Sequence, residues 1–303
     1  MRSRTTRRPS LRPTPTSGSV PVISTAVVVL LAATLVAPRP AEAARPPVHV
    51  ALGDSYTAGP FIPDPIGTPV GCLRSGRSWA RLLAASTGAR LRDASCAGAT
   101  VTRLGRRQIV LGGPNPAQLA RVDDDATLVT LQIGGNDLGF GSILVRCLAL
   151  WPVGSPCRNR YIRDGVDTLA VRIARLAPRI GAAIDAVRRR APRARIVLVG
   201  YPLILPRAGN GCWPRMPFTP TDVAYLRSIH FRLERALAVQ ARAHRAVWVD
   251  LAGPSTGHDA CAPAPQRWVE PLVPAVDAAP VHPNATGMAA FAGIVRRRLA
   301  GVS

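Results

Sequence analysis

Short runs of apolar, often β-branched residues alternate with longer stretches in which apolar residues recur at helical spacing. The short runs predict strands and the longer stretches predict amphipathic helices. The predicted strands cover residues 48–52, 89–93, 127–133, 195–199 and 246–251, and the predicted helices cover residues 78–86, 166–190, 221–243 and 284–299. We expect Thr221 or Asp222 to cap the third helix and Asn284 the fourth. This alternation indicates a three-layer α/β/α sandwich around a mostly parallel five-stranded sheet.

Residues 1–43 have the pattern of an export signal. Five arginines precede an apolar run over residues 20–37, and Ala41-Glu42-Ala43 then gives the small-x-small pattern of a signal-peptidase site. We therefore expect cleavage after Ala43 and a secreted chain of residues 44–303 that forms one domain. A retained membrane anchor is the alternative, because the apolar run is almost long enough to span a bilayer. Arg7-Arg8 fits a twin-arginine signal poorly, since it lies well before the apolar run.

The chain is strongly basic, with a formal net charge of +22 at pH 7, and all 39 of its basic residues are arginines. Cleavage after Ala43 removes six arginines and one glutamate, which leaves a charge of +17. Such a charge favours contact with anionic membranes or cell-wall polymers. The densest arginine clusters, residues 188–190 and 296–298, lie at predicted helix C-termini, where cations stabilise the helix dipole. The sequence has no basic stretch interleaved with aromatic residues, so we expect no nucleic-acid partner.

Six cysteines follow the predicted cleavage site, and no two of them have C-x-x-C spacing. An even number of cysteines in an exported chain favours disulfides, so we expect three disulfides and no metal site. Six cysteines allow fifteen pairings, among which the sequence does not choose. Our working expectation pairs neighbours along the chain, which closes each loop locally: Cys72 with Cys96, Cys147 with Cys157, and Cys212 with Cys261.

Polar residues of particular chemistry follow three of the predicted strands. Ser55 ends the first strand in Gly53-Asp54-Ser55-Tyr56. A serine hydroxyl becomes a nucleophile only when a base takes its proton and donors stabilise the resulting oxyanion. His282 lies just before the final predicted helix, beside a proline, which suits a base held in one orientation. Gly98 and Asn136 follow the next two strands and offer a backbone N–H and a side-chain amide as oxyanion donors.

Other histidines and a second serine compete with this interpretation. His258 lies in a loop and is the alternative base, whereas His49, His230 and His244 are interpreted as structural. Gly253-Pro254-Ser255-Thr256-Gly257 matches the G-x-S-x-G nucleophile elbow. An elbow turns into a helix, and the residues after this motif have no helical pattern. We therefore reject Ser255 as the nucleophile.

Taken together and in this order, Gly53-Asp54-Ser55, Gly98, Gly134-Gly135-Asn136-Asp137 and His282-Pro283 resemble the blocks of the SGNH (GDSL-type) hydrolase family. The resemblance covers essentially the whole mature chain, and the signal peptide with six cysteines is similar to the secreted actinobacterial lipases and esterases of that family. It implies that Ser55 is the nucleophile and His282 its general base. It also implies an oxyanion hole formed by the backbone N–H groups of Ser55 and Gly98 and the Asn136 side chain.

One position departs from the family pattern, in which an aspartate three residues before the histidine orients the imidazole. That position is Ala279. Either the Ala279 carbonyl accepts the imidazole N–H, which we favour, or Asp277 reaches the ring from two residues further back. A carbonyl can fix the tautomer, but it stabilises imidazolium less than a carboxylate does. Asp54 and Asp137 are interpreted as structural, since each can bond backbone N–H groups in its own turn.

The resemblance implies a monomeric carboxylic ester hydrolase that needs no cofactor, but it does not specify the ester. The proline- and glycine-rich segments 202–220 and 252–283 are expected to form one wall of a cleft. An apolar loop suits lipid or aryl esters, although its residues could equally pack in the core: Phe140, Ile143, Leu144, Leu148, Leu150 and Trp151. The alternatives are a polysaccharide O-deacetylase of the same fold and a catalytically weak basic protein that binds anionic wall polymers or lipid surfaces.

Overall fold

The computed structural model describes residue 18 and residues 46–301. Five parallel strands form the central sheet, in the order β11-β10-β7-β1-β4. Their bounds are β1 Val48–Gly53, β4 Arg90–Asp93, β7 Leu128–Gln132, β10 Arg195–Val199 and β11 Val247–Val249. The predicted sheet is confirmed, with a last strand three residues long instead of six. The predicted signal peptide and its cleavage site lie outside the described residues, apart from residue 18.

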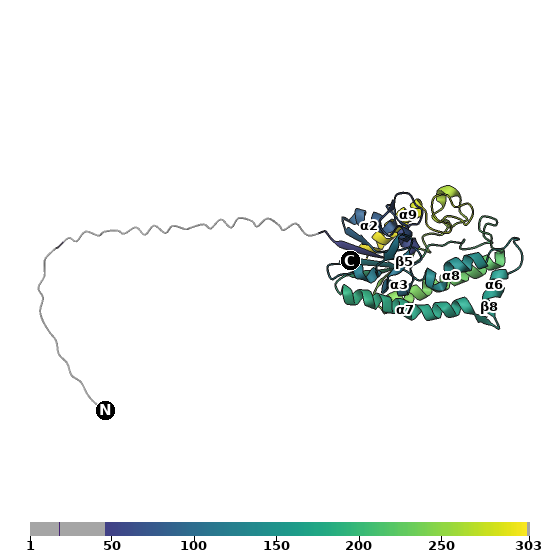
Figure 1. Ribbon diagram of the computed structural model, residues 1–303, viewed down its shortest axis with the longest axis horizontal. Coiled ribbons are helices and arrows are strands. Elements are labelled where there is room, and N and C mark those ends of the chain that lie inside the picture. The colour runs from purple at the N-terminus through teal and green to yellow at the C-terminus, as the bar shows by residue number, and fades with distance from the viewer. Residues whose placement is uncertain (1–17, 19–45, 302–303) are drawn as a thin grey trace, which may run out of the picture. The chain divides into compact units, whose positions relative to one another are not determined.

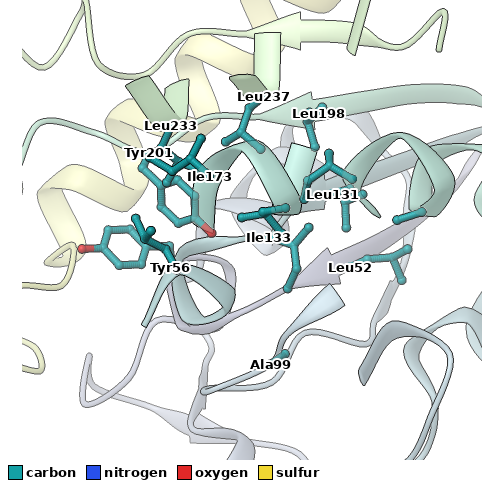
Figure 2. Close-up of a cluster of buried hydrophobic side chains, with 14 of the residues drawn as sticks. Leu52, Tyr56, Ala99, Leu131, Ile133, Ile173, Leu198, Tyr201, Leu233 and Leu237 are labelled. Carbon is teal, nitrogen blue, oxygen red and sulfur yellow. The ribbon is translucent and has the colours of Figure 1, made fainter. Parts of the chain in front are cut away.

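Four long helices cover the two faces of the sheet: α2 Trp79–Thr87, α7 Thr168–Arg190, α8 Pro220–Ala243 and α9 Ala285–Ala300. Side chains of β1 alternate between the faces, so Val50 and Leu52 pack in one core cluster with α7 and α8, and Ala51 packs in the other with α2 and α9. Figure 1 shows the two helix pairs on opposite sides of the sheet. In Figure 2, Leu52 lies in the same cluster as Ile173 of α7 and Leu237 of α8. The predicted three-layer sandwich is therefore confirmed.

Side-chain caps fix where the long helices begin. Asp167 accepts hydrogen bonds from two N–H groups of the first turn of α7, and Asn284 caps α9 as predicted, by accepting from the Gly287 N–H. The prediction for α8 is wrong, because Thr219 is the cap and accepts from the Asp222 N–H. Asp222 instead accepts two backbone N–H groups at the start of α6, which lies beside α8.

Short elements fill the connections between the long ones, and they were beyond sequence prediction because a few residues show no periodicity. The short helices are α1 Ser55–Ala58, α3 Val101–Leu104, α4 Gly135–Leu138, α5 Phe140–Arg146, α6 Pro156–Tyr161 and the 3₁₀ turns η1 Val70–Cys72, η2 Gln118–Arg121 and η3 Ala264–Gln266. The two-stranded ribbons pair β2 Pro65–Ile66 with β3 Arg74–Ser75, β5 Gln108–Val110 with β6 Gly113–Asn115, and β8 Ile162–Arg163 with β9 Val166–Asp167.

Three disulfides tie the connecting segments together, and all three expected pairings are confirmed. Cys72 bonds to Cys96, Cys147 to Cys157, and Cys212 to Cys261. The last of these joins segments 202–220 and 252–283, the two loops expected to form one wall of a cleft. Among the described residues, no helix has the length and apolar character needed to cross a membrane.

Candidate active site

Ser55 lies in a tight turn between β1 and the short helix α1, which it begins. Asp54 caps that helix, because its Oδ1 accepts a hydrogen bond of 2.9 Å from the Tyr56 N–H. Gly53 is required before it, since a Cβ there would clash with Thr57 and lie 2.8 Å from the Gln132 carbonyl oxygen. The turn therefore fixes the direction in which the serine side chain leaves the strand.

His282 lies beside Ser55, although the two residues are far apart in the sequence. Its Nε2 is 2.8 Å from the Ser55 Oγ, and its Nδ1 is 2.8 Å from the Pro280 carbonyl oxygen. A carbonyl can only accept, so the hydrogen-bond network assigns the proton to Nδ1 and leaves Nε2 to accept from the serine hydroxyl. The arrangement is that of a nucleophile and its base.

Both predicted orienting groups for His282 are wrong. The Ala279 carbonyl accepts the backbone N–H of His282 at 3.1 Å, not the ring, and the Asp277 side chain is exposed. The carbonyl that accepts the ring N–H belongs to Pro280. Val281 explains the difference, because its φ of +55° puts the backbone in the left-handed region just before the histidine. This turn brings the carbonyl two residues before His282 back to its own ring.

Burial lowers the pKa of His282 below its ordinary value of 6.5, while the hydrogen bond to the Pro280 carbonyl acts in the opposite direction. The imidazole is therefore neutral at neutral pH, as a general base must be. Tyr56 contacts the same loop: its hydroxyl donates to the Val281 carbonyl at 2.6 Å, and its ring centroid lies 5.1 Å from that of His282. The sequence gives Tyr56 only as the neighbour of Ser55 and offers no signal for this contact.

A buried hydrogen-bond chain connects the turn of Ser55 to the turn of Asn136. The Tyr201 hydroxyl donates to Asp54 Oδ2 at 2.6 Å and accepts from the Gly135 N–H at 2.9 Å. Burial raises the pKa of Asp54 to about 7, although the Tyr201 hydroxyl and the Tyr56 N–H favour its charged form. Asp54 thus binds within its own turn as interpreted, and it also binds Tyr201, which sequence reasoning missed.

The other motif aspartate reaches further than its own turn. Asp137 Oδ2 accepts the Val101 N–H of α3 at 2.9 Å, and its Oδ1 pairs with Arg179 of α7 at 3.0 Å. Both contacts join α4, which carries Asn136, to neighbouring helices. The role is structural, as interpreted, and it spans three helices.

The three residues predicted to supply oxyanion donors, Ser55, Gly98 and Asn136, line one cavity with His282. The Asn136 amide donates one N–H to the Ala99 carbonyl at 2.9 Å, which holds the side chain and leaves a second N–H to donate. Over residues 46–301, the backbone N–H groups of Ser55 and Gly98 have no acceptor within the chain. Gly98 has a φ of +74°, a conformation that favours glycine. The structure therefore brings the predicted donors together with free N–H groups.

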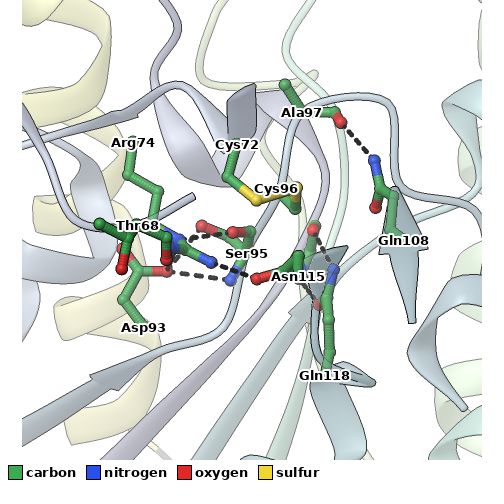
Figure 3. The surroundings of a disulfide bond; sticks show 11 residues. Thr68, Cys72, Arg74, Asp93, Ser95, Cys96, Ala97, Gln108, Asn115 and Gln118 are labelled. Atoms are coloured by element: carbon green, nitrogen blue, oxygen red, sulfur yellow. Dashed lines mark hydrogen bonds and ion pairs between the residues drawn. A yellow bond between two sulfur atoms is a disulfide. The ribbon is translucent and has the colours of Figure 1, made fainter. Parts of the chain in front are cut away.

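The loop that carries Gly98 is held from both sides (Figure 3). The disulfide to Cys72 fixes Cys96, and the Ala97 N–H donates to the Cys72 carbonyl at 3.0 Å. The Ala97 carbonyl in turn accepts from the Gln108 side chain at 2.7 Å. A donor aimed at an oxyanion contributes most when it does not have to reorganise, and this loop meets that condition.

The cavity has a volume of about 450 Å³ and mostly apolar walls. Phe140, Ile143 and Leu144 of the expected apolar loop line it, whereas Leu148, Leu150 and Trp151 do not and are 46%, 87% and 71% exposed. The loop was expected either to face an ester substrate or to pack in the core. Three of its six apolar residues face the cavity and the other three face solvent, so neither expectation holds for the whole loop. Segments 202–220 and 252–283 both contribute lining residues, so the expected cleft wall is confirmed.

The competing residues are placed elsewhere. The Ser255 hydroxyl is buried, where it accepts the Leu203 N–H and donates to the Ala252 carbonyl. His258 stacks on Trp268 at 4.0 Å and donates to a backbone carbonyl. His49 and His244 bind neighbouring side chains, at Thr130 and Asp185.

His230 differs from the expectation of a purely structural residue, because it lines the cavity and has a buried Nε2 with no partner among the described residues. Burial lowers its pKa to about 4. In the part of the chain that the structure describes, no group of three or more His, Cys, Asp or Glu side chains could hold a metal ion.

Comparison with known proteins gives consistent matches. A model of the GDSL-like Lipase/Acylhydrolase family matches residues 51–290. Lipase 2 of Streptomyces coelicolor is 37% identical over 286 residues, which are 92% of this chain and 94% of the relative. The crystal structure of an extracellular lipase from Streptomyces rimosus has a TM-score of 0.69 and 27% identity, and the match covers 83% of this chain and 99% of that one. Phospholipase A1 from Streptomyces albidoflavus has a TM-score of 0.70 at 23% identity, covering 84% and 99%, and shows the fold alone.

The family match runs from β1 into α9 and includes Ser55, Gly98, Asn136 and His282. Lipase 2 is similar to the chain over nearly the full length of both. The resemblance expected from the sequence motifs is therefore confirmed. The chain belongs to the GDSL-like lipase/acylhydrolase family and is a carboxylic ester hydrolase.

Proposed function

We propose that this hydrolase cleaves esters with an apolar acyl chain through an acyl-enzyme on Ser55. The observation that carries the proposal is the distance of 2.8 Å between the Ser55 Oγ and the His282 Nε2, at the wall of a cavity of about 450 Å³. The nucleophile and its base are in hydrogen-bond contact, and the space beside them is apolar. A serine esterase or lipase needs both features.

The reaction follows from the arrangement of these groups. The Ser55 Oγ attacks the ester carbonyl carbon while its proton passes to the His282 Nε2. The backbone N–H groups of Ser55 and Gly98 and the Asn136 amide donate to the oxyanion that forms. As the ester C–O bond breaks, His282 returns the proton to the leaving alkoxide. A water molecule, deprotonated by His282, then attacks the acyl-enzyme and releases the acid.

The Pro280 carbonyl takes the place of the missing aspartate in this scheme. It accepts the Nδ1 proton of His282 at 2.8 Å and so keeps the Nε2 lone pair directed at Ser55. The missing aspartate favours the alternative of a catalytically weak binding protein. The Pro280 contact weighs against that alternative, because it fixes the tautomer in which His282 accepts from Ser55. The apolar cavity lining, which includes Phe140 and Leu144, favours an acyl chain over the acetyl group of a polysaccharide deacetylase.

Turnover of p-nitrophenyl esters, from acetate to palmitate, tests the proposal. We expect Ser55→Ala to lower kcat/KM by at least about 10³-fold on every ester. The matched control is Ser255→Ala, which removes the hydroxyl of the rejected elbow motif. It should lower the free energy of unfolding by about 1–2 kcal/mol and leave kcat/KM nearly unchanged. A folded Ser55→Ala protein with normal turnover, or a folded Ser255→Ala protein without it, would overturn the assignment.

We further propose that the chain is secreted after removal of residues 1–43. The small-x-small motif at Ala41-Glu42-Ala43, three disulfides and the similarity to an extracellular lipase support this proposal. N-terminal sequencing of protein from the culture medium should then begin at Ala44. Recovery of all of the protein with the membrane fraction, with residues 1–43 still attached, would favour the retained anchor.

A further inference from the structure

Five apolar side chains at the end of α5 and in the segment that follows it face solvent close to the cavity. The first of them, Val145, also lines the cavity, so this exposed segment adjoins it directly. The exposed fractions are 70% for Val145, 46% for Leu148, 87% for Leu150, 71% for Trp151 and 72% for Val153. Isolated exposed apolar residues are ordinary, but a group of this kind marks an interaction surface.

A further exposed apolar residue, Trp213, is joined to this segment by a hydrogen bond, and another, Val273, is joined to the loop that carries Trp213. Trp213, 40% exposed, donates its indole N–H to the Ala149 carbonyl at 3.3 Å. Val273, 60% exposed, donates its backbone N–H to the Arg215 carbonyl at 3.2 Å, and Arg215 is two residues from Trp213. We call these seven residues the apolar rim: Val145, Leu148, Leu150, Trp151, Val153, Trp213 and Val273. Three chain segments thus contribute to one exposed surface beside the cavity.

The two segments that carry six of the seven rim residues, 138–163 and 202–220, have charge of one sign. Residues 138–163 contain four arginines and no acidic residue, and residues 202–220 contain two more arginines and no acidic residue. The four arginines of the first segment are all exposed: Arg146, Arg158, Arg160 and Arg163. The disulfide between Cys147 and Cys157 keeps α6, with Arg158 and Arg160, next to the end of α5. Cations therefore flank the exposed apolar side chains.

Exposed aliphatic and tryptophan side chains beside arginines are the combination that binds anionic lipid surfaces. The apolar groups enter the boundary between headgroups and acyl chains, and each cation near the surface is attracted to the lipid charge. A protein partner would need polar complementarity, for which residues 138–163 and 202–220 offer cations and no carboxylate. The formal charge of residues 44–303, +17, adds long-range attraction in the same direction.

We propose that the apolar rim and the four arginines of residues 138–163 form a docking surface for anionic phospholipid membranes. Docking seats the cavity entrance on the lipid, so an ester enters the cavity from the membrane instead of from water. This inference rests on the proposed function only in taking the ester from the membrane as the substrate; binding of the surface to lipid does not depend on hydrolysis. Apart from Val145, which also lines the cavity, the residues of the docking surface lie outside those that bind and cleave the ester.

Cosedimentation with vesicles tests the proposal. The purified Ser55→Ala protein is mixed with phosphatidylglycerol vesicles or with phosphatidylcholine vesicles, so that binding is measured without hydrolysis. Leu150→Ser/Trp151→Ser should weaken binding to the anionic vesicles by about tenfold or more. Arg146→Gln/Arg160→Gln should weaken it by several-fold and flatten its dependence on salt.

Val239→Ser is the matched control. Val239 is 46% exposed on α8, about 25 Å along the helix from Asp222, the residue that binds α6. The Val239→Ser protein should bind both kinds of vesicle as the parent does. In the active Ser55 background, the rim and arginine variants should hydrolyse soluble p-nitrophenyl acetate at the parental rate, which shows that they are folded.

Two results would overturn the docking surface. One is a Leu150→Ser/Trp151→Ser protein that binds anionic vesicles as tightly as the parent. The other is equal binding of the parent to phosphatidylcholine and phosphatidylglycerol, which would remove the role of the arginines. Loss of vesicle binding with retained p-nitrophenyl acetate turnover supports docking. Because binding is measured in a protein without the serine nucleophile, a failure of the proposed hydrolysis is seen separately.

Discussion

The position of the His282 ring depends on main-chain groups and on one tyrosine hydroxyl. Val281 has a β-branched side chain and a φ of +55°, a conformation that costs about 1–3 kcal/mol unless its surroundings hold it. The Tyr56 hydroxyl donates to the Val281 carbonyl at 2.6 Å from a buried position. Tyr56 is therefore a positioning residue, which acts on the imidazole through the turn that precedes it.

Replacing Tyr56 by phenylalanine removes this hydrogen bond and keeps the ring. We expect kcat on a soluble ester to fall about tenfold, because the imidazole loses its fixed orientation. KM should change little, since the hydroxyl faces the Val281 carbonyl and not the acyl chain. The control is Tyr161→Phe, because the Tyr161 hydroxyl is buried and has no partner among the described residues. An unchanged kcat in Tyr56→Phe would show that the turn holds without the hydroxyl.

Residue chemistry explains why some of the site could be predicted and the rest could not. Ser55 and Asn136 directly follow apolar strands, in turns that contain glycine, so their sequence context marks the sheet edge; Gly98 follows a more polar strand and is marked by its place in the motif order. The Pro280 carbonyl has no such mark, because every residue has a carbonyl and only the backbone conformation of Val281 directs this one. Tyr201 is missed for a similar reason, since its contact with Asp54 joins segments that only the fold brings together.

At the scale of elements, the start of α9 holds the loop that carries His282. Asn284 accepts the Gly287 N–H at 3.0 Å as the helix cap and donates its amide to the buried Glu270 carboxylate at 2.9 Å. Glu270 pairs by its backbone with both residues before the proline: its N–H donates to the His282 carbonyl, and its carbonyl accepts the Val281 N–H. One asparagine thus joins the helix to the histidine loop.

Asn284→Ala removes both the cap and a donor to a buried carboxylate. We expect the free energy of unfolding to fall by about 1–3 kcal/mol and kcat/KM to fall as well, because the loop of His282 loses its anchor. Thr219→Ala is the matched control, since Thr219 caps α8 in the same way and lies outside this loop. Denaturant unfolding and p-nitrophenyl ester turnover measure the two effects. A loss of stability in Asn284→Ala with full activity would show that the cap does not act on His282.

The long elements could be predicted because burial on one or both faces imposes a period on many residues. The run of residues 127–133 gave β7 Leu128–Gln132 almost unchanged. The last strand, β11, is shorter than predicted because the apolar and tryptophan run of residues 246–251 continues past its pairing with β10, where Asp250 instead accepts backbone N–H groups of the following turn. A hydrophobic run determines which residues are buried, whereas the length of a strand depends on how many of its residues pair with the neighbouring strand.

At the scale of the whole molecule, two buried carboxyl groups in the core make the stability of the fold depend on pH. Most carboxyl groups in folded proteins stabilise the fold in their charged form, but these two favour the neutral form. Burial raises the pKa of Glu234 to about 8 and that of Asp54 to about 7. Glu234 Oε1 accepts the Tyr201 N–H at 2.9 Å, and its Oε2 has no partner among the described residues. A carboxyl group so poorly solvated binds a proton in the folded chain at a pH where the unfolded chain has released it.

This difference makes the folded state less stable as the pH rises. The unfolded Glu234 carboxyl titrates near its ordinary pKa of 4.5 and the folded one near about 8, so its stabilising contribution is complete below the first value and lost above the second. Glu234→Gln keeps an acceptor for the Tyr201 N–H and cannot titrate. The free energy of unfolding of the parent minus that of Glu234→Gln should therefore fall between pH 5 and pH 9, by more than about 1.4 kcal/mol, the equivalent of one pKa unit. Asp277→Asn, at an exposed aspartate, should show no such trend. Denaturant unfolding at several pH values measures the difference, and a flat profile would mean that water reaches Glu234 in the folded core.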